Sequence, residues 1–386
     1  MNIPRRSWIV AAPATISLCA LALSGCASTS ASGSGGTATG SGSSGVTAAK
    51  ATSAADLGGM DALVKAAKAE GQLNVITLPR DWANYGTLMD DFAKKYGIKI
   101  TDANPDGSSA DEITAIKTLK SQPTAPDVVD VGQAFALSGT QEKLYAPYKV
   151  ATWDKIPDSL KDADGNWFND YGGYVSIGCD TARVTSCPTS LADLDKPEYK
   201  DKVALNGDPT KANAAFNAVW AAALANGGSF DNIQPGIDFF GKLKKDGVYV
   251  PVQATAATIQ SGETPIVLDW DYLNAAKAEK VSTFKTVVPS DAKLPGYYAQ
   301  AISAYAPHPA AARLWEEYLY SAEGQNGFLA GYARPAEMTA MTQDASIDKA
   351  AAAKLPAVDG TPTFPSQHQI TKAKTTLTQN WSAAVS

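Results

Sequence analysis

Short apolar runs alternate with stretches of helical periodicity along most of this chain, and this alternation constrains the fold more than any other feature. The runs at 73–78 (LNVITL), 98–101 and 128–131 (VVDV) have the length and composition of buried strands. The helical stretch at 60–70 ends at Gly71, a residue type that commonly terminates helices. Strands that alternate with helices at this pitch predict an α/β fold with parallel-rich sheets flanked by helices.

The second half of the chain repeats this pattern. Its apolar runs lie at 174–179, 202–205, 265–268 and 285–289, with an Ala-rich helix at 212–226 between them. The body contains about 330 residues, which is too many for one core of ordinary size, so we expect two lobes. The expected boundaries are 54–173 for the first lobe, with 297–340 returning to it, and 174–296 for the second, with 341–386 packing on it.

The N-terminus has the features of an export signal. Arg5 and Arg6 precede an apolar run that is short for a membrane span and ends in small residues. Residues 23–26 (LSGC) resemble the lipobox of bacterial lipoproteins, which implies that 1–25 are a signal peptide and that Cys26 is diacylated after cleavage. The two arginines also partly match a twin-arginine signal, so both export routes remain open.

A Ser/Gly/Thr/Ala-rich segment at 26–53 follows, and its composition predicts a flexible tether. No later segment is apolar enough to span a bilayer. We therefore expect an extracytoplasmic protein, anchored to the cell membrane only through the lipid on Cys26. The formal net charge is −6, no basic run is present, and nucleic acid is not an expected partner.

Two cysteines remain once Cys19 is assigned to the signal and Cys26 to the lipid. Cys179 and Cys187 are expected to form a disulfide that braces a small local loop, because exported proteins reside where disulfides persist. A zinc site is the alternative, but no histidine lies near either cysteine in sequence, and we predict no metal site.

The motif that most resembles a known family is 302–325 (ISAYAPHPAAARLWEEYLYSAEGQ). It is supported by Glu70-Gly71, by 126–129 (PDVV) and by Gly262-Glu263. Taken in this order over most of the body, these fragments resemble the extracellular solute-binding proteins of ABC importers. The similarity is to the branch that includes polyamine, ferric, thiamine and phosphonate binders.

That resemblance implies a two-lobed periplasmic-binding-protein-like fold (type II), with hinge strands between lobes that close on a small solute. It also implies a monomer that passes its solute to an ABC permease and its ATPase, without catalysis and without a cofactor. An exported hydrolase is the rival class, but the chain has no G-x-S-x-G or H-E-x-x-H motif, and the S-x-x-K match at 346–349 lacks its companion motifs. A sensor lipoprotein that kept the fold without transport remains open.

Candidate ligand-binding residues follow the predicted strands, because open α/β sheets bind ligands beyond the carboxyl ends of their strands. The loop at 79–85 carries Asp81, Trp82 and Tyr85 and resembles the N-W-x-x-Y loop of polyamine binders, with Asp81 in place of Asn. The other candidates are Ser108, Ser109, Asp130, Gln133, Thr210, Asn213, Trp270, Asp271, Tyr272, Tyr297 and Tyr298. Core packing of the aromatic side chains and helix capping by Ser108, Ser109 and Thr210 are the alternative roles.

Aromatic rings and carboxylates together favour a cationic organic amine such as a polyamine, since both attract positive charge. The helix starts near Ser108 and Thr210 favour a phosphonate or carboxylate instead, and thiamine also remains possible. Ferric binders of this branch have two adjacent tyrosines where this chain has Trp270-Asp271-Tyr272, which disfavours iron.

Overall fold

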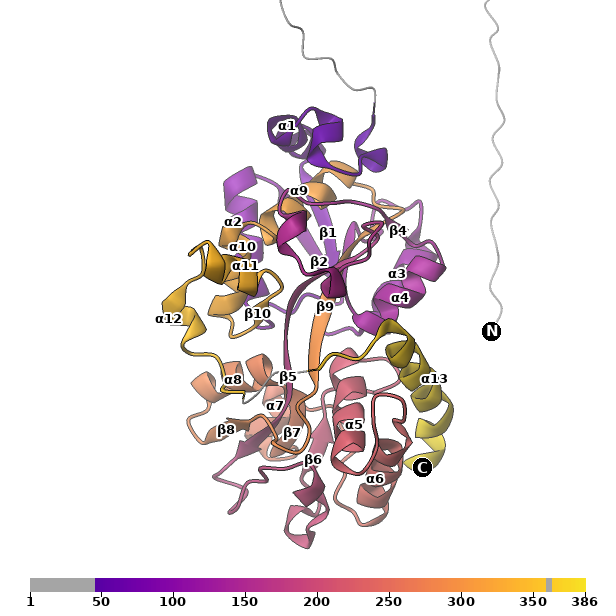
Figure 1. Cartoon of the computed structure of the whole chain (residues 1–386), viewed down its shortest axis with the longest axis vertical. Helices are drawn as coiled ribbons and strands as arrows, with labels where there is room; N and C mark the ends of the chain where they lie inside the picture. The colour runs from indigo at the N-terminus through magenta and orange to yellow at the C-terminus, as the bar shows by residue number, and fades with distance from the viewer. Residues whose placement is uncertain (1–45, 359–362) are drawn as a thin grey trace, which may run out of the picture. The chain divides into compact units, whose positions relative to one another are not determined.

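The structure, a computed structural model, describes residues 46–358 and 363–386 (Figure 1). The expected signal peptide, Cys26 and the expected tether up to residue 45 lie outside these residues. Residues 46–53, which the sequence also assigned to the flexible tether, instead pack on the body: Ala48–Lys50 form a 3-10 turn, and Ala51 is buried and its carbonyl accepts the Nε–H of Arg313 at 2.8 Å. Among the described residues, no helix has the length and apolar character needed to cross a membrane. No group of three or more His, Cys, Asp or Glu side chains placed to hold a metal ion occurs in that part of the chain.

The first lobe is defined here as the elements packed around β1, β2 and β3. It begins with α1 (Met60–Glu70), β1 (Gln72–Ile76), α2 (Tyr85–Tyr96), β2 (Lys99–Ala103), α3 (Ser109–Leu119), β3 (Val128–Gly132), α4 (Gln133–Gln141) and β4 (Tyr145–Ala146). The helix predicted at 60–70 is confirmed, and its terminal Gly71 adopts φ 69°, the left-handed conformation that glycine accepts without strain. β1 and β2 pair in parallel.

Two long strands, β5 (Phe168–Asp180) and β9 (Pro295–Ser303), run between the lobes and are called the crossing strands (Figure 1). The first part of β5 pairs with β9, and its last part pairs with β7 (Ile266–Trp270) and β8 (Phe284–Val287). The C-terminal part of β9 pairs with β3 and β4. The crossing strands therefore belong to both lobes, as hinge strands would.

The second lobe is defined as the elements packed around β6, β7 and β8. Its further elements are β6 (Val203–Leu205), α5 (Asn213–Ala225), α6 (Gln234–Lys245), α7 (Ala256–Ser261) and α8 (Asp271–Lys280). The Ala-rich helix α5 is buried over most of its length, which explains why its sequence is apolar nearly all round. A disulfide joins Cys179, near the end of β5, to Cys187 and closes a small loop.

After β9 the chain returns to the first lobe. The returning elements are α9 (Pro309–Leu319), α10 (Ala322–Ala330), β10 (Arg334–Pro335), α11 (Met338–Gln343) and α12 (Lys349–Ala352). The last helix, α13 (Gln367–Ala384), packs against α6 and α5 of the second lobe and against α4 of the first. Short 3-10 turns occur at Ala48–Lys50, Ala54–Leu57, Trp153–Lys155, Asp158–Leu160, Ala192–Asp195 and Pro197–Tyr199.

The predicted α/β class is confirmed, but strand direction is more mixed than the alternating pattern indicated. Among the described strands, β1 with β2 and β6 with β7 are parallel, whereas β3, β5, β7, β8 and β9 pair antiparallel with one another. The reason is topological. β5 leaves the first lobe and β9 returns to it, so the two crossing strands must run in opposite directions.

Candidate functional site

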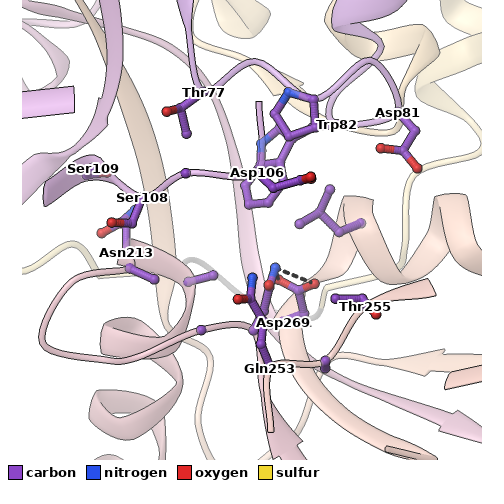
Figure 2. A pocket seen from close by; sticks show the side chains of 18 of the residues that line it. Thr77, Asp81, Trp82, Asp106, Ser108, Ser109, Asn213, Gln253, Thr255 and Asp269 are labelled. Carbon is purple, nitrogen blue, oxygen red and sulfur yellow. Dashed lines mark hydrogen bonds between the residues drawn. The ribbon is translucent and has the colours of Figure 1, made fainter. Parts of the chain in front are cut away.

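A cavity of about 660 Å³ lies between the loops of the two lobes and is called the cleft (Figure 2). The first lobe contributes the loops after β1 and β2, including Thr77, Asp81, Trp82, Asp106 and Ser108, and Asp130 from within β3. The second lobe contributes Asn206, Lys211, Asn213, Gln253, Asp269 and Lys277, and β9 contributes Tyr298. Strand-end loops thus form both walls of the cleft, in agreement with the rule for α/β sheets.

The cleft brings together half of the ligand-binding residues predicted from the sequence. These are Asp81, Trp82, Ser108, Ser109, Asp130, Asn213 and Tyr298. Figure 2 shows Trp82, Asp81 and Asp106 on one side of the cavity and Gln253, Asp269 and Thr255 on the other.

The structure places the other half elsewhere. Tyr85, Trp270 and Tyr272 are fully buried, and Asp271 is buried in an ion pair with Arg334. Gln133 and Tyr297 line a separate cavity of about 370 Å³ beside α5 and α13. Thr210 donates its backbone N–H and its hydroxyl to the Asp208 carboxylate and does not line the cleft.

Trp82 is the aromatic side chain that reaches into the cleft from the first lobe. Its indole Nε1 donates a hydrogen bond of 2.8 Å to the Tyr171 hydroxyl on β5. Its ring packs in T-shaped pairs against Tyr298 and Tyr272, with ring centroids 5.8 and 6.4 Å apart, respectively. Trp82 thereby connects the first lobe to rings on β9 and α8, and part of its surface remains open to the cleft.

The two serines before α3 have structural partners. Both the backbone N–H and the hydroxyl of Ser108 donate to the Asp111 carboxylate, at 2.9 and 2.7 Å, which caps α3. The Ser109 hydroxyl accepts the N–H of Gly132 at 3.1 Å. Ser108 therefore has the capping role that the sequence suggested as an alternative to ligand binding. Both serines also line the cleft.

Asp130, in the middle of β3, is the centre of a buried acidic network. Its Oδ2 accepts hydrogen bonds of 2.9 Å from the hydroxyls of Tyr85 and Tyr171, while its Oδ1 has no hydrogen-bond partner. The Asp130 N–H donates to Glu112, a cleft-lining acid that the sequence did not single out. Burial raises the pKa of Asp130 to about 7 and raises the pKa of Glu112 well above its usual range.

The second lobe supplies a charged pair that the sequence also missed. Lys277 on α8 donates to Asp269 at the end of β7 over 2.7 Å, and Asn206 donates to the same carboxylate at 3.1 Å. Asp269 directly precedes Trp270. The sequence indicated Trp270, Asp271 and Tyr272 as candidates at this strand end, so the neighbouring residue that lines the cleft was missed. At the edge of the cleft, Lys280 of the second lobe pairs with Asp81 of the first at 3.3 Å.

Acidic side chains outnumber basic ones in the cleft, which is lined by seven carboxyl groups and three lysines. Two of the lysines, Lys277 and Lys280, are paired with acids. The remaining acids give the cavity the electrostatic character that a cationic group requires.

Two α/β lobes, joined by two crossing strands and separated by a polar cleft, are the architecture of a two-lobed binding protein. The sequence profile described as "Bacterial extracellular solute-binding protein" matches residues 124–357, and this chain belongs to that family. The family provides the solute-binding components of ABC importers, which bind small molecules and work with a permease and an ATPase. Its members are substrate-binding proteins rather than enzymes. The predicted family is therefore confirmed.

Solved structures of periplasmic binding proteins share the fold at low sequence identity. AfuA from Actinobacillus pleuropneumoniae, solved with fructose-6-phosphate, is 18% identical with a TM-score of 0.65, and the match covers 82% of this chain and 98% of AfuA. The spermidine/putrescine binding protein PotD from Streptococcus pneumoniae is 16% identical with a TM-score of 0.54 and coverage of 82% and 99%. The Trichodesmium protein FutA, solved with iron and citrate, is 17% identical with a TM-score of 0.56 and coverage of 81% and 99%. No sequence among the curated proteins matches this chain.

Proposed function

We propose that this protein captures a cationic organic amine, such as a polyamine, in the cleft and delivers it to its ABC permease. The observation that carries the proposal is Asp130, a buried carboxyl that lines the cleft together with Trp82 and Tyr298 and has one oxygen without a hydrogen-bond partner. A carboxylate and ring faces both attract an ammonium group, most strongly where water is displaced.

Lobe closure follows from the same arrangement. Trp82 and Asp81 extend from the first lobe, whereas Asp269 and Lys277 lie on the second, so a solute in the cleft contacts both lobes at once. A solute that binds the closed arrangement more tightly than an open one shifts the protein toward closure. We infer that the permease recognises this closed state.

A second candidate is a solute that carries a phosphonate or phosphate group. The start of α5 favours it, because its N-cap residue, Ala212, has no side chain to accept hydrogen bonds from the first turn. Asn213 and Lys211 line the cleft at that point. The fold shared with AfuA, solved with a sugar phosphate, is compatible with this candidate.

The N-terminal features complete the proposal. Cleavage before Cys26 and diacylation of that cysteine would tether the binding domain outside the cell membrane through the Ser/Gly/Thr/Ala-rich segment that follows it. The crossing strands and both lobes are formed within one chain, and we propose that the protein acts as a monomer.

The proposal is tested by the melting temperature of the purified protein with putrescine, spermidine, thiamine, an aminoalkyl phosphonate and fructose-6-phosphate. A ligand that binds only the folded state raises the melting temperature by mass action. We expect an amine to raise it, and Asp130→Asn to weaken amine binding at least about tenfold, because a charge-assisted hydrogen bond is worth ~1.5–3 kcal/mol. Asp154→Asn, an exposed acid outside the cleft, is the matched control and should bind like the wild type. A shift with phosphate or phosphonate compounds and none with any amine would contradict the proposal in favour of the second candidate.

A further inference from the structure

The C-terminal helix α13 contacts both lobes but is fastened to the second. It packs against α6 and α5 of the second lobe and against α4 of the first (Figure 1). Asn380 on α13 donates a hydrogen bond of 2.8 Å to Gln234 on α6, and the ring of Trp381 packs on Phe240 of α6 with centroids 5.7 Å apart. We therefore expect α13 to move with the second lobe whenever the lobes move.

Lys374, in the middle of α13, touches both lobes with one amine group. Its Nζ donates to the backbone carbonyl oxygens of Pro209 and Thr210, at 3.2 and 2.9 Å, in the loop before α5. The same nitrogen lies 4.6 Å from the centre of the Phe135 ring on α4 and 5.2 Å from that of Phe216 on α5. Phe135 belongs to the first lobe and the other three partners to the second, so this amine is a contact between the lobes.

The charge of the Lys374 amine suits these contacts. Burial lowers the pKa of Lys374 to about 8, against the opposing effect of the Asp208 carboxylate, so the amine remains mostly charged at pH 7. A charged amine is attracted to the faces of aromatic rings, and more strongly where water is displaced. The charge therefore favours the arrangement in which Phe135 of the first lobe lies against the second.

The loop that Lys374 holds is part of the cleft wall. Asp208 and Lys211, on either side of the two carbonyl groups that accept from Lys374, line the cleft. Lys374 itself does not line it. Its effect on a solute in the cleft is therefore exerted through this loop and through the position of the lobes.

A second close approach of the two lobes lies beside the amine. A Cβ atom on Gly132, at the end of β3, would lie 2.2 Å from the side chain of Asn213 at the start of α5. Gly132 has a φ of −62°, which any residue can adopt, so the neighbouring lobe rather than the backbone limits the size of this residue. Gly132 lies three residues before Phe135, and both therefore belong to the surface of the first lobe that meets the start of α5.

We propose that Lys374 is a positioning residue that latches the two lobes together beside the cleft. It joins α4 of the first lobe to the loop before α5 of the second, and thereby favours the closed arrangement before a solute is bound. A protein with a larger closed fraction binds its solute more tightly, because more of the molecules are in the binding-competent state. This inference rests on the proposed binding of the solute in the cleft.

The first measurement is the radius of gyration of the solute-free protein at pH 7, from small-angle X-ray scattering. Lys374→Met keeps an apolar side chain of similar length but removes the charge, and Phe135→Leu removes only the ring that the amine meets on the first lobe. Both variants should have a larger radius than the wild type, with unchanged circular dichroism. Gly132→Ala, whose methyl group would separate the same surfaces without altering Lys374, should also be larger.

The matched control is Lys372→Met, which removes an exposed lysine from the same helix and should leave the radius at the wild-type value. The second measurement is the association constant for putrescine at pH 7, from titration calorimetry. Lys374→Met and Phe135→Leu should each lower it about threefold, the effect of one cation–π contact. The double variant should lose no more than the larger of the two single losses, because either change alone breaks the same latch.

The outcomes separate this inference from the proposed function. An unchanged radius in Lys374→Met and Phe135→Leu would overturn the latch, and so would losses of putrescine affinity that add in the double variant. Larger radii in these variants, together with no putrescine binding by the wild type, would support the latch and remove the amine proposal. Putrescine binding that is equal in the wild type and both single variants would retain amine capture and overturn the positioning role of Lys374.

Discussion

Asp271 begins α8 directly after Trp270, yet its carboxylate points away from the cleft. Its Oδ1 accepts the N–H groups of Tyr174 and Tyr272 at 2.9 and 3.0 Å, and its Oδ2 pairs with Arg334 at 2.5 Å. The sequence placed this acid at a strand end, where ligand contact was expected. The structure instead uses it to join α8 to a crossing strand and to the return segment of the first lobe.

This difference predicts a loss of stability at Asp271. Asp271→Ala leaves Arg334 partly buried and uncompensated, which should lower the free energy of unfolding by about 3–5 kcal/mol. The matched control is Asp81→Ala, which breaks the Asp81–Lys280 pair, whose side chains are 67% and 61% exposed, and should cost less than about 1 kcal/mol. Urea unfolding followed by tryptophan fluorescence measures both. Equal losses in the two variants would contradict the role assigned to Asp271.

At the scale of elements, the sequence located helices and short strands better than the crossing strands. The helix at 60–70 matches α1 because its periodicity and terminal Gly71 are both local signals. For β5 only 174–179 was recognised, because its first half contains Asn169 and Asp170, polar residues that are buried through hydrogen bonds to distant segments. Such partners lie far away in sequence, so no local pattern reveals that these residues form a buried strand.

Glycines in the crossing strands give an element-scale prediction. A Cβ atom on Gly296 of β9 would lie 2.2 Å from the ring of Trp270, and one on Gly173 of β5 would lie 2.1 Å from the Asp271 carboxylate. The start of α8 can therefore pack on the crossing strands only where side chains are absent. Gly296→Ala should lower the free energy of unfolding by about 1–3 kcal/mol, the usual cost of overpacking a core.

The same urea titration tests this change. Gly296→Ala combined with Trp270→Phe provides the control, because the smaller ring removes the atoms that the new methyl group would meet. Gly296→Ala should lower the free energy of unfolding less when it is introduced into Trp270→Phe than when it is introduced into the wild type. Additive losses would contradict the proposed clash.

For the molecule as a whole, family and two-lobed fold were predictable, whereas only half of the proposed site residues line the cleft. The residues found include Trp82, which follows β1, and Asp130, which lies within β3, and the sequence marks both strands clearly. Glu112 and Lys277 were missed because they lie on helix faces that become polar cleft walls only when the lobes are assembled. Helical periodicity alone does not distinguish such a face from ordinary solvent exposure.

Buried acids also make the stability of the whole molecule depend on pH. Burial raises the pKa of Asp170, Glu112 and Glu316 well above the ordinary value and raises that of Glu337 to about 7. Neither carboxylate oxygen of Glu316 has a hydrogen-bond partner, which favours its neutral form. The folded chain therefore binds more protons than the unfolded chain between about pH 4 and the raised pKa values.

Because the folded state binds more protons in this window, the free energy of unfolding should fall as pH rises from 5 to 8, by an amount on the order of a few kcal/mol. Exposed acids do not reverse this trend, because the pKa of Asp344 is lowered to about 2 by Lys155 and its effect is confined to acid below about pH 4. Urea midpoints at pH 5, 6.5 and 8 give the measurement, and Glu316→Gln should flatten the slope because an amide has no proton to lose. A free energy of unfolding that rises toward pH 8 would mean that these carboxyls are ionised in the folded chain.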